Sequence, residues 1–115
     1  ETGGILLGYF DMKLHHLFLV DAMSAPSDSD ADSSGFTRGK EGIQEHLKEC
    51  ARRTANIVGY VGEWHSHPRN ASARPSSLDV QLIAHLASEM AQDGYPALML
   101  IVGERDYSFS LGDKT

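Results

Sequence analysis

The most informative part of this chain is the stretch Trp64-His65-Ser66-His67-Pro68, which is followed after seven residues by Ser76-Ser77-Leu78-Asp79. Alternate side chains of a β-strand share one face, so His65 and His67 are expected to project together. Pro68 is expected to end that strand, because it has no N–H to donate to a neighbour. Two imidazoles and the Asp79 carboxylate are three ligands suited to one zinc ion, with a fourth position left open for water.

The pair Ser76 and Asp79 also has a purely structural interpretation. Ser-x-x-Asp before an apolar helical run is close to a capping box, with Ser76 as the N-cap and Asp79 in the first turn. Taken alone, this interpretation is the commoner one. The two interpretations are compatible, because a fixed helix start can hold Asp79 against the histidines.

Two further side chains complete a hydrolytic site. Ser76 is placed to donate a hydrogen bond to an oxyanion that forms on a carbonyl substrate. Glu1, at the head of Glu1-Thr2-Gly3-Gly4, is a candidate general base that takes a proton from water and passes it to a leaving amine. The pattern indicates a zinc-dependent hydrolase.

Hydrophobic periodicity predicts the other elements. We expect strands over 5–10, 14–21, 57–64, 97–102 and 107–111, a turn over 11–13, and helices over 41–56 and 78–92. The second helix is expected to bury Val80, Ile83, Ala87 and Met90. This order predicts a mixed α/β fold in which helices flank a central mixed sheet.

Residues 23–35 are rich in Ser and Asp and show neither strand nor helix periodicity, which predicts a solvated loop. Its residues Asp28, Asp30 and Asp32 alternate, as calcium ligands do. The calcium-loop pattern also requires a Gly at its sixth position and a Glu at its twelfth, and both are absent here. We therefore expect a loop without a calcium role.

Bulk properties limit the classes of protein that this chain can belong to. A length of 115 residues fits a single domain, and the net charge of −6 argues against nonspecific nucleic-acid binding. No apolar run reaches the ~20 residues of a membrane span, and no signal peptide is evident. The single Cys50 fits a reducing, cytoplasmic environment. Because Glu1 already stands at a strand, without Met, residues 1–115 are expected to be one domain cut from a longer chain.

The remaining polar and aromatic candidates have weaker signals. We expect structural roles for His15 and His16, which would point to opposite faces of the second strand, for His46, and for His85, which is either buried and hydrogen-bonded or exposed. Trp64 is expected in the core. Glu63 shares a face with His65, so it either supports the metal ligands or lies at the surface.

Taken together, Glu1-x-Gly3-Gly4, His65-Ser66-His67-Pro68 and Ser76-x-x-Asp79 resemble the complete JAMM motif of the MPN+/JAB metalloproteases. The stretches 60–68 and 75–76 are similar to the prokaryotic JAB branch, and especially to the deconjugating peptidases of bacterial cGAS-like (CBASS) antiphage operons. The resemblance implies an MPN/JAB, cytidine-deaminase-like fold over residues 1–115. It implies that His65, His67 and Asp79 bind zinc, that Glu1 is the general base, and that Ser76 stabilises the tetrahedral intermediate.

Family members cut after the C-terminal glycine of a ubiquitin-like protein, in a conjugate or a precursor, and often work beside activating-like and conjugating-like enzymes. They usually carry a strand and a helix before the motif glutamate, and these elements are absent from residues 1–115. Two alternatives stay open. One is a noncatalytic MPN-type scaffold, and the other is a zinc amidase or peptidase that acts on a sulfur-carrier precursor or a small amide.

Overall fold

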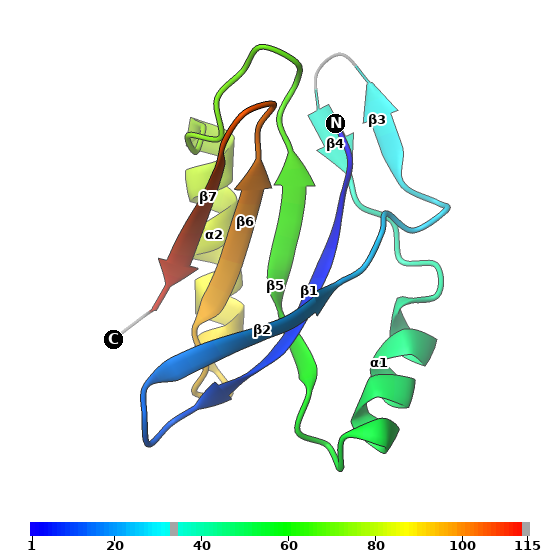
Figure 1. Ribbon diagram of the computed structural model, residues 1–115, viewed down its shortest axis with the longest axis vertical. Coiled ribbons are helices and arrows are strands. Elements are labelled where there is room, and N and C mark those ends of the chain that lie inside the picture. The colour runs from blue at the N-terminus through cyan, green and yellow to red at the C-terminus, as the bar shows by residue number, and fades with distance from the viewer. Residues whose placement is uncertain (33–34, 114–115) are drawn as a thin grey trace.

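The computed structural model describes residues 1–32 and 35–113, which form a curled five-stranded sheet, a two-stranded hairpin and two helices (Figure 1). The sheet order is β2-β1-β5-β6-β7, with bounds β1 Gly3–Asp11, β2 His16–Ala22, β5 Gly59–Ser66, β6 Ala97–Val102 and β7 Tyr107–Gly112. Strands β5 and β6 are parallel, and the other neighbouring pairs are antiparallel. The predicted mixed α/β fold is confirmed.

Helices α1 (Ile43–Arg53) and α2 (Ser77–Ala91) lie on the same face of this sheet. The strand register places Ile5 beside Glu63 and Glu63 beside Met99, so these three side chains share that face. Ile43 of α1 packs against Ile5, and Ile83 of α2 packs near Met99. A space therefore remains between the two helices, above β5.

The opposite face is closed by the curl of the sheet. Strand β2 crosses in front of β1 and β5 (Figure 1), and Leu17 of β2 packs on a buried cluster of Leu6, Val61 and Leu98. Trp64 is partly buried against the same cluster, as expected of a core residue, and its indole N–H donates to the Met23 carbonyl at 2.7 Å.

The prediction of a structureless loop over 23–35 is wrong in its second half. Strands β3 (Asp30–Asp32) and β4 (Gly35–Thr37) pair there as a short hairpin. Three-residue strands are too short to give a readable alternation. Of the three alternating aspartates, Asp28 has a structural role, because its carboxylate accepts the backbone N–H groups of Lys40 and Glu41. The side chain of Asp32 lies outside the described part of the structure.

The first turn also differs from the prediction. Residues 12–15 form it, and His15 lies in it with φ 54° instead of on the second strand. The reason is Asp11, whose Oδ1 accepts the N–H groups of Lys13 and Leu14 and thereby closes a longer turn. His15 contacts Phe10 edge-on and His16 contacts Phe18 edge-on, which are structural contacts.

Helix α2 begins and ends within one residue of the prediction, but its buried face is different. Val80 is 56% exposed, against the prediction. Ala87 is buried as predicted, and Leu86, which was not predicted, is buried as well. The helix serves two surfaces, since Ile83 packs on the sheet side and Leu82 faces the space between the helices. Its apolar residues therefore occupy two sides of the helix, so helical spacing alone does not identify the buried face.

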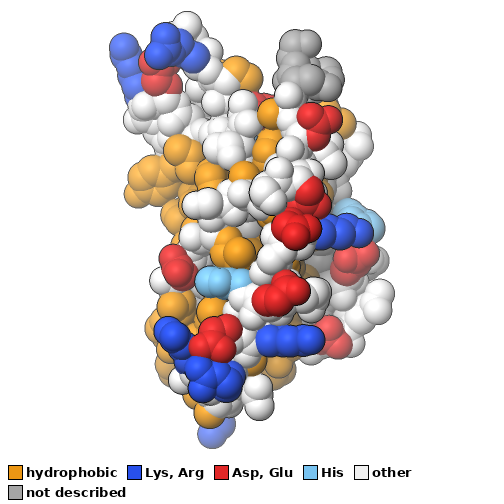
Figure 2. Space-filling view, turned by 90° about the vertical axis from the view of Figure 1, so that its right-hand side faces the viewer, with side chains coloured by type: hydrophobic (Ala, Val, Ile, Leu, Met, Phe, Trp, Pro, Cys, Tyr) orange, Lys and Arg blue, Asp and Glu red, His pale blue; other side chains and the backbone are white. Residues whose placement is uncertain are grey.

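The surface around α1 carries mixed charges. Figure 2 shows acidic and basic side chains interspersed on this side, and on α1 the Glu49 carboxylate accepts hydrogen bonds from Arg52 and Arg53. Neither α1 nor α2, the helices of the described ranges, has the length and apolarity of a membrane-spanning helix.

Candidate metal centre

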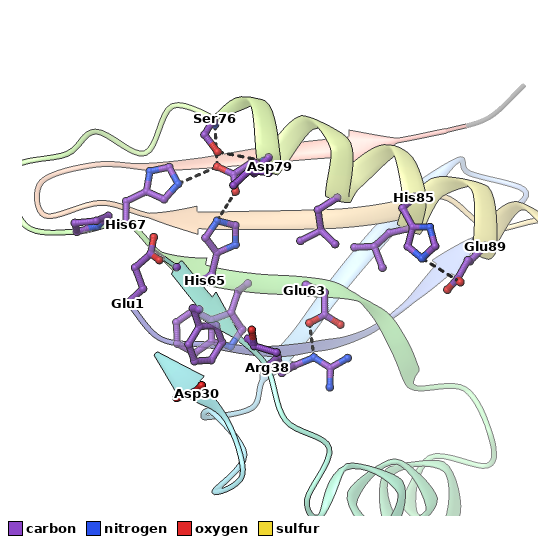
Figure 3. Close-up of a pocket in the computed structure, with 18 of the residues that line it drawn as sticks. Glu1, Asp30, Arg38, Glu63, His65, His67, Ser76, Asp79, His85 and Glu89 are labelled. Atoms are coloured by element: carbon purple, nitrogen blue, oxygen red, sulfur yellow. Dashed lines mark hydrogen bonds and ion pairs between the residues drawn. The ribbon is translucent and has the colours of Figure 1, made fainter. Parts of the chain in front are cut away.

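The three predicted ligands meet where β5 ends and α2 begins. His65 Nε2 lies 2.8 Å from Asp79 Oδ1, and His67 Nε2 lies 2.9 Å from Asp79 Oδ2 (Figure 3). The ligand atoms of His65, His67 and Asp79 all lie within 4.8 Å of one another. Within residues 1–32 and 35–113, no other three His, Cys, Asp or Glu side chains gather in this way.

The ring of His67 is oriented by a backbone group. Its Nδ1 lies 2.7 Å from the Ser72 carbonyl oxygen, and a carbonyl can only accept, so Nδ1 carries a proton. In the neutral ring Nε2 is then an unprotonated acceptor that faces the Asp79 carboxylate, which is another acceptor. Such a pair requires a cation or a proton between its members, and a carbonyl behind a ligating histidine is the arrangement that supports metal binding.

The electrostatics of His67 agree with this geometry. Burial lowers the pKa of His67, but the hydrogen bond to Ser72, the carboxylate of Asp79 and the charge of Glu1 outweigh burial and raise it. Burial likewise raises the pKa of Asp79, yet hydrogen bonds from Ser76 and the proximity of the His67 and His65 rings lower it overall. The site therefore favours positive charge between a carboxylate and two imidazoles.

Asp79 is held by the predicted capping box. Ser76 is the N-cap of α2, its Oγ accepts the Asp79 N–H at 3.2 Å, and its own N–H donates to Asp79 Oδ2 at 2.8 Å. One carboxylate oxygen thus serves the cap and faces His67 as well. Both interpretations of the Ser-x-x-Asp pattern hold in the geometry: Asp79 starts the helix and points at the histidines.

Glu1 reaches the site because the segment that follows it, Thr2 and β1, is fastened to β5. Ser66 turns away from the two histidines, and its Oγ accepts the Thr2 N–H at 2.9 Å while its N–H donates to the Thr2 carbonyl at 2.7 Å. Gly3 allows the close approach, since a Cβ there would lie 2.4 Å from the Trp64 carbonyl oxygen. The Glu1 side chain lies beside His65 and His67 (Figure 3).

Glu1 and Ser76 both line an open groove of about 1080 Å³ that also contains the three candidate ligands. One wall of the groove is α2, with Leu82 and Leu86, and the other includes Phe36 of the β3–β4 hairpin. The Ser76 hydroxyl uses an oxygen lone pair for the cap, so its proton stays available to donate into the groove.

Other candidates have structural partners. Glu63 is not at the surface: it is buried, and its carboxylate forms an ion pair with Arg38 at 2.5 Å. Of the two alternatives for His85, buried or exposed, the structure shows the exposed one: its ring lies on the surface of α2, with Nε2 3.2 Å from Glu89 Oε1. Sequence reasoning missed the parts played by Ser66, Ser72 and Arg38; the alternation of β5 could have suggested Ser66, whereas the Ser72 contact uses a backbone atom that leaves no residue-type signal.

The donor set of two imidazole nitrogens and one carboxylate oxygen fits a divalent transition metal, and zinc commonly takes such a set with one position left open. The orientation of His67 by Ser72 and of Asp79 by Ser76 is present without any rearrangement. The residues therefore fit a catalytic metal ion.

Comparison with known proteins agrees with this chemistry. The family described as prokaryotic homologues of the JAB domain matches residues 1–112. A CD-NTase/cGAS isopeptidase of Enterobacter hormaechei subsp. hoffmannii is 35% identical over 103 residues, which cover 90% of this chain and 55% of that protein. A protein of the same name from Vibrio cholerae is 30% identical over 114 residues, which cover 99% of this chain and 67% of that protein.

A third relative, the probable metalloprotease y4qB of Sinorhizobium fredii, is 25% identical over 104 residues, covering 90% of this chain and 63% of that protein. The chain thus spans between 55% and 67% of the length of these relatives. Their names describe peptidases, two of them isopeptidases and one a metalloprotease.

Proposed function

This chain belongs to the family of prokaryotic JAB-domain homologues, and on that premise we propose that it is a zinc-dependent isopeptidase or peptidase that cleaves after the C-terminal glycine of a ubiquitin-like protein. The observation that carries the proposal is the convergence of His65, His67 and Asp79, with Glu1 beside them in an open groove. In this proposal, the first three residues hold the metal, Glu1 is the base and Ser76 is the oxyanion donor.

When bound, zinc supplies a Lewis acid that polarises a carbonyl and makes a nearby water more acidic. Glu1 then takes the proton of the attacking water and delivers it to the leaving amine. The Ser76 hydroxyl donates to the oxygen that gains negative charge as the carbonyl carbon becomes tetrahedral. The Ser72 carbonyl keeps the proton of His67 on Nδ1, so Nε2 would be available to hold the metal.

The names of two relatives support the substrate class. Both are isopeptidases of CD-NTase/cGAS, and an isopeptidase acts on a side-chain amide such as that of a lysine conjugate. We propose the same kind of conjugate for this chain. The groove is open, and its volume of about 1080 Å³ lies near the upper end of the ~300–1,000 Å³ range of ligand pockets, so it has room for an extended polypeptide tail.

Substitution of Glu1 by Gln tests the mechanism. The Glu1→Gln protein should keep its metal content, because Glu1 is not a ligand, but should cleave a ubiquitin-like fusion about 10²- to 10⁴-fold more slowly. Metal content is measured by elemental analysis after exhaustive purification, and cleavage by gel and by release of a fluorescent reporter. Glu45→Gln, which neutralises an acidic side chain in the first turn of α1, is the matched control.

Two results would overturn the proposal. One is a purified protein that binds no transition metal under conditions in which it cleaves the fusion. The other is full activity of the Glu1→Gln protein. A protein that binds zinc stoichiometrically and hydrolyses nothing would favour the scaffold alternative.

A further inference from the structure

The segment between β2 and α1 leaves the sheet, and its hairpin forms the wall of the groove that faces α2 (Figure 3). Asp30, Phe36 and Thr37 of this hairpin line the groove, followed by Arg38. Side-chain contacts fasten this wall to β5 at both ends: Trp64 with the Met23 carbonyl at its beginning, and Glu63 with Arg38 at its end.

The contact at the end is a well-satisfied ion pair. Arg38 Nε donates to Glu63 Oε1 at 2.5 Å, and Arg38 Nη1 donates to the Gly39 carbonyl at 2.6 Å. The Tyr60 hydroxyl donates to the other Glu63 oxygen at 2.5 Å. Burial first, and then the Glu63 charge, raise the pKa of Tyr60, so the phenol keeps the proton that it donates.

The position of the pair links the wall to the proposed metal ligands. Glu63 lies on β5 two residues before His65 and on the same face, which corresponds to roughly 7 Å along the strand. The side chain of Glu63 is 11% exposed and that of Arg38 is 29% exposed, so solvent screens the pair only in part. The same strand therefore carries the hydrolytic centre at its end and the attachment of the wall just before it.

We propose that Arg38 and Glu63 are positioning residues, which hold the β3–β4 hairpin as the wall against which a polypeptide substrate lies upstream of its scissile bond. The inference rests on the proposed function. Its consequence is selectivity for length: a folded ubiquitin-like protein with its tail contacts the hairpin wall, whereas a di- or tripeptide amide reaches only the metal end of the groove.

The test compares two substrates in the full-length protein. Glu63→Gln keeps the acceptor for Tyr60 but removes the charge that pairs with Arg38. For a ubiquitin-like protein fused through its C-terminal glycine to a reporter, KM should rise by roughly tenfold while kcat changes little, the scale expected when about one substrate contact is lost. For a Gly-Gly aminocoumarin amide, kcat/KM should stay within about threefold of the wild-type value.

Further measurements distinguish a positioning role of the Arg38–Glu63 pair from a general contribution of the pair to stability. Arg38→Ala and the double variant should not add to the effect of Glu63→Gln, because each breaks the same contact, and Arg38→Lys should recover part of the loss. Glu45→Gln, which neutralises an acidic side chain in the first turn of α1 outside the groove, is the matched control. Amide hydrogen exchange should accelerate over residues 35–38 and not at the start of α2.

A readout without turnover uses the Glu1→Gln background, in which fluorescence anisotropy measures binding of the fusion. The added Glu63→Gln should weaken that binding by about the same factor as KM. The inference is overturned if the activities toward both substrates fall in parallel or if neither activity changes. It is also overturned if Glu63→Gln does not fold while Arg38→Ala leaves both activities and the exchange rates as in the wild type. Failure of the proposed function is distinct, because the wild-type protein would then cleave neither substrate.

Discussion

The two walls of the groove are built in different ways. On the side of α2, the proposed ligand Asp79 is fixed by contacts within three residues of sequence, and His65 lies on β5 with His67 just beyond its end. On the hairpin side, the chain between β2 and α1 is fixed by contacts that span 41 residues from Met23 to Trp64 and 25 residues from Arg38 to Glu63. The comparison teaches that the proposed metal site depends on residues close together in sequence, whereas the proposed substrate wall depends on residues far apart in sequence.

The largest effect is expected at the locally built wall. Asp79→Ala should abolish metal binding and reduce cleavage by at least about 10³-fold, since several kcal/mol of charge stabilisation is lost. Elemental analysis and turnover of a ubiquitin-like fusion measure the two losses. Asp93→Ala, which removes an exposed carboxylate just beyond the other end of α2, should change neither. Retention of metal by Asp79→Ala would contradict the assigned ligand set.

Ser76→Ala comes next, because it removes a cap and a proposed oxyanion donor together. We expect a loss of about 1 kcal/mol in the free energy of unfolding and a decrease of roughly 10²-fold in kcat. Urea unfolding and steady-state kinetics separate the two effects. Ser77→Ala, at the first residue of α2, is the control. A decrease in stability with unchanged kcat would leave Ser76 as a cap alone.

On the hairpin side, Trp64→Phe should have a moderate effect that leaves the metal centre intact. The substitution removes the hydrogen bond from the indole to the Met23 carbonyl, at a cost of about 1 kcal/mol in the free energy of unfolding. Metal content should be unchanged, and protease cleavage between residues 24 and 32 should become faster. If Trp64→Phe lowered the metal content as well as the resistance of residues 24–32 to protease, the two walls would not be independent.

The smallest effect is expected when a lower pH protonates Asp28 and removes its contribution to the free energy of unfolding. Hydrogen bonds from the backbone N–H groups of Lys40 and Glu41 lower the pKa of Asp28 below its ordinary value of 3.8. Its contribution to stability is therefore complete above that value and is lost as the pH falls through the lower pKa of the folded state.

Asp28→Asn should remove this contribution, so the difference in stability between the wild type and the variant should shrink as the pH falls below about 4. Thermal unfolding between pH 6 and pH 3 measures that difference. A difference that grows on acidification would contradict the assigned contacts of Asp28.

The same division explains what could be predicted from sequence. The strand alternation around His65 and His67 and the capping box of Asp79 are short-range patterns, so the elements and the meeting of these side chains could be predicted together. The β3–β4 hairpin could not, since its strands have three residues each and their support comes from Glu63 and Trp64, far along the chain. The predicted burial of Val80 is wrong because α2 presents apolar residues to both the sheet and the groove, so helical spacing alone does not identify the buried face.

The oxygen that Asp79 shares between the start of its helix and His67 has a practical consequence. Helix formation itself places this proposed ligand, so the metal-free protein should take up an ion without refolding. Cobalt bound at the proposed centre would then provide a spectroscopic reporter, with little disturbance of the surrounding architecture.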